Sequence, residues 1–118
     1  MTDYRSKLIT ARQAVDMVQS NDYIVTGLGP SFADSFFSQL HTAADRLRAV
    51  TISTCLPMRD HPCFSDPAYA KSFLHDAWFY SPPTRKVHKF GASSFVPNNL
   101  HFAGTKRLYH RKPRIYVG

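Results

Sequence analysis

A chain of 118 residues, of which 43% are hydrophobic and 14% aromatic, is long and apolar enough to form one globular domain, which excludes a disordered polypeptide. The sequence contains no apolar run long enough to cross a membrane and no apolar leader after Met1, so we expect a cytoplasmic protein with no membrane partner. The formal net charge is +7, and the basic residues that cause it are spread along the chain. All eight acidic residues are Asp, and the sequence contains no Glu.

The first predicted elements are a helix and a short strand. Thr10 followed by Gln13 fits a capping box, and apolar residues at helical spacing from Ala11 to Val18 predict an amphipathic helix. Turn residues at 20–22 end this helix, and the β-branched pair within Tyr23–Thr26 predicts a buried strand.

A glycine-proline turn at 27–31 then leads into a second helix. Ser31 with Asp34 repeats the capping pattern, and an apolar stripe runs on from Ala33 to Leu47. A strand that ends at such a turn delivers backbone amides to the start of a helix, which suits an anionic ligand.

The rest of the chain continues the alternation of helices and strands. We expect a strand at 50–54, a loop at 56–66, a short helical turn from Asp66, a strand at 73–80, a helix from Pro82 to a cap at Gly91, a strand at 93–96, partial helix at 98–111 weakened by Gly104, and a strand at 114–117. This order predicts one α/β domain over residues 1–118, with an open, mostly parallel sheet flanked by helices. Because the sequence stops at Gly118, directly after the start of a strand, we expect it to be part of a longer protein.

The turn at 27–31 differs from the common nucleotide loops. A dinucleotide-binding loop needs a third glycine where this chain has Phe32, and the Gly-Lys-Ser/Thr of a P-loop is absent. Two interpretations stay open. The glycines serve only the backbone geometry of the turn, or the turn lines a ligand site at the carboxyl end of its strand.

Other candidate sites are weaker. Cys55, His61 and Cys63 lie close in sequence, but their spacing fits no common zinc motif, so we expect no metal and two buried or partly buried free thiols. His75 and Asp76 are neighbours in a predicted strand and point to opposite faces, so they are not expected to act on one atom, and Trp78 is expected in the core.

Basic and aromatic residues are interleaved near the C-terminus at Phe102, Arg107, Tyr109 and Arg111, as on some nucleic-acid-binding surfaces. No motif of a nucleic-acid-binding module accompanies them, so we expect no nucleic-acid partner.

An ordered set of segments carries a family resemblance. The set consists of Tyr4–Lys7, Ala14–Val18, Ile24–Pro30, His75 with Trp78 and Phe79, Arg85, Gly91 and Phe95–Pro97. It resembles the N-terminal part of the acetyl-CoA hydrolase/transferase family, which includes 4-hydroxybutyrate CoA-transferases.

The resemblance implies a CoA-transferase fold and chemistry. Family members move coenzyme A, as substrate, between an acyl-CoA and a small carboxylate through a glutamyl-CoA intermediate, without a metal. The glutamate belongs to a later part of a longer chain. The resemblance therefore implies no catalytic residue here, a missing C-terminal half as partner, and a homo-oligomer when the protein is intact. It places Gly27, Leu28, Gly29 and Pro30 at the border of the acyl pocket.

Two departures from the family pattern and two rival functions remain. Phe32 and Ala33 replace a frequent Glu-Pro pair, which predicts a more apolar pocket edge, and Asn21 replaces a frequent glycine before Asp22.

The rival functions are a non-catalytic α/β domain that binds an anionic metabolite or a protein, and a basic nucleic-acid-binding domain.

Overall fold

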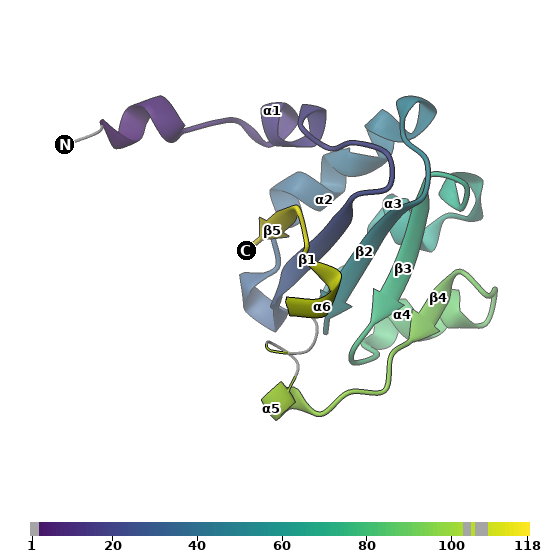
Figure 1. Ribbon diagram of the computed structural model, residues 1–118. Helices are drawn as coiled ribbons and strands as arrows, with labels where there is room; N and C mark the ends of the chain where they lie inside the picture. The colour runs from purple at the N-terminus through teal and green to yellow at the C-terminus, as the bar shows by residue number, and fades with distance from the viewer. Residues whose placement is uncertain (1–2, 103–104, 106–108) are drawn as a thin grey trace.

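The computed structural model describes residues 3–102, 105 and 109–118, and within them it contains a five-stranded sheet (Figure 1). The strands are β1 (Tyr23–Leu28), β2 (Val50–Cys55), β3 (Phe73–Ala77), β4 (Ser93–Phe95) and β5 (Ile115–Val117). Their order across the sheet is β4-β3-β2-β1-β5, and all four pairs are parallel. The predicted α/β class with a parallel sheet is confirmed.

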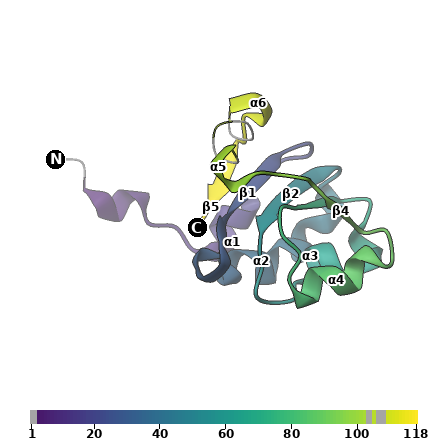
Figure 2. The same cartoon turned by 90° about the horizontal axis from the view of Figure 1, so that it is seen from below.

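Short helices connect the strands. They are α1 (Ala11–Asp16), α2 (Asp34–Leu40), α3 (Pro62–Ser65), α4 (Pro82–His88), α5 (Leu100–Phe102) and α6 (Tyr109–Arg111), with 3₁₀ turns at Tyr4–Lys7, Gly29–Ser31, His41–Arg46 and Pro67–Tyr69. Figures 1 and 2 show α2, α3 and α4 on one face of the sheet, while α5 and α6 lie toward the other face. The chain therefore travels from β1 to β4 on one side and returns to β5 on the other.

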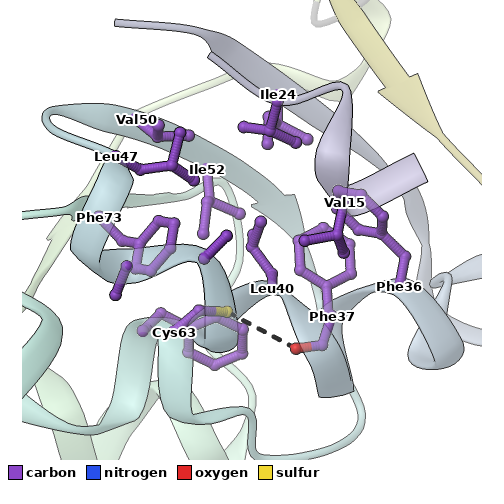
Figure 3. Close-up of a cluster of buried hydrophobic side chains, with 14 of the residues drawn as sticks. Val15, Ile24, Phe36, Phe37, Leu40, Leu47, Val50, Ile52, Cys63 and Phe73 are labelled. Carbon is purple, nitrogen blue, oxygen red and sulfur yellow. Dashed lines mark hydrogen bonds between the residues drawn. The ribbon is translucent and has the colours of Figure 1, made fainter. Parts of the chain in front are cut away.

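The main core lies between the helices and the first face of the sheet (Figure 3). Ile24 and Ile52 point into it from β1 and β2, and Phe37 and Leu40 meet them from α2. All four side chains are fully buried. Burial of each such side chain stabilises the fold by about 1.5–3 kcal/mol before the entropy cost of ordering it.

Two predicted helix starts and one predicted helix end are confirmed. The Gln13 backbone N–H donates to Thr10 Oγ1 at 3.1 Å and the Thr10 N–H donates to Gln13 Oε1 at 2.8 Å, which completes the capping box of α1. At α4, the Ser81 N–H donates to the Thr84 hydroxyl oxygen at 2.8 Å. Gly91 follows this helix with a φ of +70°, a conformation that glycine adopts without steric cost.

The start of the second helix was predicted wrongly. The Ser31 hydroxyl donates to the Leu28 carbonyl at 2.9 Å and so closes the 3₁₀ turn at Gly29–Ser31 instead of capping α2. The helix begins three residues later at Asp34, without a side-chain cap, and after Leu40 it continues as the 3₁₀ turn His41–Arg46.

Three other boundaries differ from prediction. The predicted loop at 56–66 contains α3, and β3 ends at Ala77 rather than at residue 80. In the described part of 98–111, helical structure is confined to the three-residue helices α5 and α6 and to residue 105. Gly104, which was expected to weaken this region, lies outside the described residues.

An ion pair fastens β5 to the start of β1. Arg114 Nε donates to Asp22 Oδ1 at 2.5 Å, a second guanidinium nitrogen binds Asp22 Oδ2, and that nitrogen also donates to the Met17 carbonyl at 2.7 Å. The hydrogen bond from Arg114 lowers the pKa of the Asp22 carboxyl against the opposing effect of its burial. The pair joins residues 92 positions apart, and it fixes the edge strand to the sheet.

Candidate functional site

The predicted glycine turn lies at the topological switch point of the sheet. The connection that leaves β1 passes over one face of the sheet, and the connection that enters β5, the neighbour of β1, comes over the other (Figure 2). Ligands of open α/β sheets bind outside the carboxyl ends of the strands at such a point. The turn at 27–31 follows β1 directly, so the topology places it where a ligand site is expected.

A steric contact explains Gly27, and the backbone conformation explains Gly29. A Cβ on Gly27 would lie 2.4 Å from the Ser31 carbonyl oxygen, and Gly29 has a φ of +51° with open space beside it. A Cβ on Gly118 would lie 3.7 Å from the same Ser31 oxygen, so the ends of β1 and β5 meet here. The backbone geometry of the turn is therefore enough to explain why Gly27 and Gly29 are glycines. The exposed residues beside them could still contact a ligand.

The exposed parts of the turn are apolar. Leu28 is 50% exposed and Pro30 is exposed, whereas Gly27 and Gly29 are buried. The Phe32 amide donates to the Gly29 carbonyl at 3.1 Å and the Asp34 amide donates to the Phe32 carbonyl at 2.9 Å. These two amides, which follow the turn, are therefore already paired, and the exposed side chains of Leu28 and Pro30 give the surface of the turn an apolar character.

Phe32 belongs to the core. Its ring stacks on Phe37 with 4.5 Å between centroids and on His61 at 5.4 Å, and the side chain is buried. Phe32 therefore does not make the edge of the turn more apolar, as the replacement was expected to do, because its ring is buried in the core; the exposed apolar side chain at this edge is Leu28.

Further large apolar side chains follow the carboxyl ends of the neighbouring strands. Met58 lies three residues after β2 and is 63% exposed, Phe79 lies two residues after β3 and is 40% exposed, and Phe95 ends β4 and is half exposed. Since parallel strands end at one edge of a sheet, this edge carries an apolar side chain at the end of each of its first four strands, Leu28 included.

An ion-pair cluster ties the loop after β2 to the start of α2. His61 Nε2 lies 3.0 Å from Asp34 Oδ1, and Arg59 Nε lies 3.1 Å from Asp34 Oδ2. Burial lowers the pKa of His61, and the hydrogen bond that the ring makes to the Asp34 carboxylate opposes that shift. The cluster holds the segment that carries Met58 beside the segment that follows the glycine turn. Sequence spacing gave no signal for it because its members come from different connections.

The two cysteines are buried free thiols, as predicted. Cys55 packs against Trp78, and Cys63 Sγ faces the Phe37 carbonyl oxygen at 4.0 Å. Burial raises the pKa of both thiols, which disfavours the reactive thiolate. In the part of the chain that the structure describes, no three His, Cys or Asp side chains come together as a metal site would require.

His75 and Asp76 point to opposite faces of the sheet, as predicted. His75 is buried on the core side, where Thr54 Oγ1 lies 2.9 Å from Nε2 and Ser93 Oγ lies 2.7 Å from Nδ1. Desolvation lowers the pKa of His75 to about 4, so the ring is neutral near pH 7. It links β2, β3 and β4 and has no access to a substrate.

Trp78 is buried, as expected, and its indole N–H donates to the Ser53 hydroxyl at 2.8 Å. It covers the second face of the sheet near the end of β2.

A polar cavity of about 410 Å³ lies on the same face, away from the glycine turn. Its walls include Thr51 and Leu74, each the second residue of its strand, together with Asp76, Ser94 and Arg111. Thr51 and Leu74 lie near the amino-terminal ends of their strands, whereas Asp76 is the fourth residue of β3, so the cavity extends along the strands, and none of its lining residues belongs to the glycine turn.

The interleaved basic and aromatic residues are only partly described. Phe102, Tyr109 and Arg111 are exposed, and the Arg111 guanidinium lies 5.8 Å from the centre of the Tyr23 ring. Arg107 lies outside the described residues, so the nucleic-acid interpretation stays a prediction. Across the residues with described structure, we find no helix with the length and apolarity needed to span a bilayer.

Comparison with known proteins finds similarity to a CoA-transferase. No family model matches the chain. It is 27% identical over 115 residues to a probable butyrate:acetyl-CoA coenzyme A-transferase of Syntrophomonas wolfei, with 98% of this chain and 24% of that protein covered. This chain is similar to part of a CoA-transferase. The similarity does not select the 4-hydroxybutyrate branch that the sequence suggested.

Solved structures show the same fold. RipA from Yersinia pestis superposes with a TM-score of 0.75 at 18% identity, and a mutant form of RipA with a TM-score of 0.77 at 17% identity. Each match covers 96% of this chain and 28% of the RipA chain. The chain thus spans about a quarter of the length of the proteins it matches.

Proposed function

We propose that this chain forms the N-terminal part of a CoA-transferase that exchanges coenzyme A between an acyl-CoA and a small carboxylate. The observation that carries the proposal is the 27% identity to a CoA-transferase over 98% of the chain. The position of the glycine turn at the switch point supports it independently, because a ligand site is expected there on topological grounds.

The chemistry requires a glutamate that this chain does not contain. A glutamate carboxylate attacks the thioester carbonyl, and CoA leaves as a thiolate, which gives a mixed anhydride. The thiolate then attacks the glutamyl carbonyl of the anhydride, releases the first carboxylate and forms the glutamyl-CoA thioester. The acceptor carboxylate reverses these two steps. Covalent catalysis of this kind divides one difficult exchange into easier ones.

In this proposal the chain supplies the apolar side of the acyl pocket. Gly27, Leu28, Gly29 and Pro30 border the pocket, and the exposed Leu28 side chain contacts the acyl group. Because Gly27 has no Cβ, its backbone can lie against the Ser31 carbonyl oxygen, and this close packing holds Leu28 at the switch point. The Asp34–His61–Arg59 cluster keeps the neighbouring loop in place.

The intact protein would then use coenzyme A as a substrate and need no metal. We also propose that it is cytoplasmic and homo-oligomeric, and that its remaining polypeptide supplies the glutamate and most contacts to CoA.

A chimaera tests the function. The chain replaces the matched quarter of the Syntrophomonas wolfei relative, and transfer from butyryl-CoA to acetate is followed by the formation of acetyl-CoA. We expect transfer by the chimaera, and none by the 118-residue chain alone or by the relative without its matched quarter. Turnover by the chain alone would contradict the proposal, as would a chimaera that melts cooperatively and transfers nothing.

A further inference from the structure

A polar cavity lies on the face of the sheet opposite the main core, and the candidate site does not use it. Sheets of parallel strands are normally apolar on both faces because helices cover them. The core face follows this rule at Ile52 and Phe73. The opposite face carries polar side chains at Thr51, Asp76 and Ser94, which alternate with core-facing residues along β2, β3 and β4. Polar groups at positions that packing would make apolar indicate a functional surface.

The polar side chains form two neighbouring rows across the strands. Thr51 pairs with Tyr23 of β1 in the first row, and Asp76 pairs with Ser94 of β4 in the second. Because Thr51 also pairs with Leu74, the second row begins two residues further along β3, a distance of about 6–7 Å. The cavity therefore extends over both rows.

Arg111 brings a positive charge to the first row. It is the last residue of α6, which lies toward this face of the sheet (Figure 2). Its guanidinium carbon lies 5.8 Å from the centre of the Tyr23 ring, and an aromatic face attracts a cation at that distance. Within the described part of the chain, no carboxylate forms an ion pair with Arg111, so its charge is not neutralised by Asp76. The cavity thus contains one cation and one anion that are separate from each other.

Two hydroxyls and a wall of small residues complete the cavity. Thr51 is half-buried and Ser94 is exposed, and neither hydroxyl has a hydrogen-bond partner in the described ranges. Ala70, Gly91 and Ala92 form part of the wall, and a Cβ on Gly91 would meet no atom within 4 Å. The volume of about 410 Å³ is typical of sites for small ligands.

We propose that this cavity binds a small zwitterion, with its carboxylate on Arg111 and its ammonium group on Asp76. Hydrogen bonds between such charged groups are stronger than neutral ones. The Thr51 hydroxyl donates to the carboxylate in the first row, and the Ser94 hydroxyl accepts from the ammonium group in the second. Because the charges belong to different rows, the charged ends of the ligand are several atoms apart, as in an ω-amino acid. The half-exposed Leu74 side chain contacts the apolar chain between them.

A titration with matched probes tests the site. 6-Aminohexanoate carries both charges, hexanoate lacks the ammonium group, hexylamine lacks the carboxylate, and glycine carries both charges close together. Binding to the 118-residue chain is measured by calorimetry, and amide chemical shifts in NMR spectra locate the site. We expect 6-aminohexanoate to bind about tenfold more tightly than each of the other probes, because it alone makes charge-assisted hydrogen bonds at both ends. Its largest shifts should fall at Thr51, Asp76 and Ser94.

Variants of the cavity should separate the two charges. Arg111→Met should reduce the affinity for 6-aminohexanoate to that for hexylamine, and Asp76→Asn should reduce it to that for hexanoate. Thr51→Val should weaken binding in a variant that keeps both charges. Arg85→Met and Asp45→Asn make the same charge changes at exposed positions outside the cavity, and they should leave the affinity unchanged. Urea unfolding shows whether each variant is folded.

Several outcomes would overturn the zwitterion site: no saturable binding of 6-aminohexanoate, equal binding of hexanoate, hexylamine or glycine, or wild-type affinity in folded Arg111→Met and Thr51→Val. Chemical shifts confined to another part of the chain would also overturn it. The site goes beyond the proposed function and does not depend on it. The readout is binding to the chain, so a chimaera that transfers no coenzyme A contradicts the proposed function alone.

Discussion

Replacement of Gly27 by alanine tests the steric explanation of the turn. The added Cβ would lie 2.4 Å from the Ser31 carbonyl oxygen and 2.5 Å from its Oγ, closer than carbon and oxygen atoms pack. Because one of these atoms is backbone, the turn must shift, and overpacking of this kind costs about 2 kcal/mol. With an unfolding entropy of about 2.1 cal/mol/K per residue, this corresponds to a fall in Tm of about 8 °C for the domain.

Two matched variants make the test specific. Gly29→Ala meets no atom within 4 Å and suffers only from its φ of +51°, so it should cost about 1 kcal/mol. Ser31→Ala removes Oγ but leaves the carbonyl oxygen, so it should not rescue Gly27→Ala. The measurement is urea unfolding followed by the fluorescence of Trp78, the only tryptophan. The steric explanation is refuted if Gly27→Ala costs no more than Gly29→Ala, or if Ser31→Ala restores its stability.

Three further predictions concern buried polar groups. The pKa of Asp22 is lowered in the folded state, so its pairing with Arg114 stabilises the fold at pH values above the ordinary pKa of 3.8. This stabilisation is lost as the pH falls through the lower pKa of the folded state. Urea unfolding should show that Arg114→Met is less stable than wild type at about pH 6 and that its stability depends less on acid pH, and an unchanged acid profile would contradict this. Folding lowers the pKa of His75 from 6.5 to about 4, so as the pH falls the unfolded state takes up a proton before the folded state does. The free energy of unfolding should therefore fall by about 2 kcal/mol between pH 7 and pH 5, and His75→Gln should reduce this loss. An equal dependence of stability on pH in both proteins would disprove the assignment. Cys55 and Cys63 should react with a thiol reagent only after unfolding, and rapid labelling of either in the native protein would show that it is accessible.

Local sequence signals predicted the parts of the fold that depend on neighbouring residues. The capping box at Thr10, the proline start of α4 and the glycine after it all rest on contacts within about four residues. The α/β class followed from the alternation of such elements. These features were predictable because the backbone groups they satisfy belong to the same segment.

The wrong or missing predictions involve competition or distance. Serine is a common helix cap, but the Ser31 hydroxyl donates to the Leu28 carbonyl instead. The four residues of α3 are too few to show a helical period. The contact of Asp34 with His61 spans 27 residues, and it could be found only once the folded sheet brought both connections to one edge.

The place of the glycine turn in the sheet was predictable, but the character of its surface was not. A glycine turn after a strand indicated the carboxyl end of β1, and the topology confirmed that this is the switch point. The sequence also suggested free amides for an anion. The tertiary structure pairs the amides of Phe32 and Asp34 and exposes Leu28, so the surface of the turn is apolar, which fits the acyl-pocket expectation better than the anion-binding one.

Acyl-chain selectivity in the chimaera tests most directly whether this turn borders the substrate. Leu28→Ala removes apolar surface at the carboxyl end of β1, and Leu74→Ala makes the same change at an equally exposed position in the amino-terminal half of β3. The measurement is the ratio of kcat/KM for butyryl-CoA to that for acetyl-CoA. We expect Leu28→Ala to change this ratio by about tenfold, because one or two methylenes of a bound chain are worth about 1–3 kcal/mol, and Leu74→Ala to leave it unchanged. An unchanged ratio in a folded, active Leu28→Ala chimaera would contradict an acyl pocket at the glycine turn.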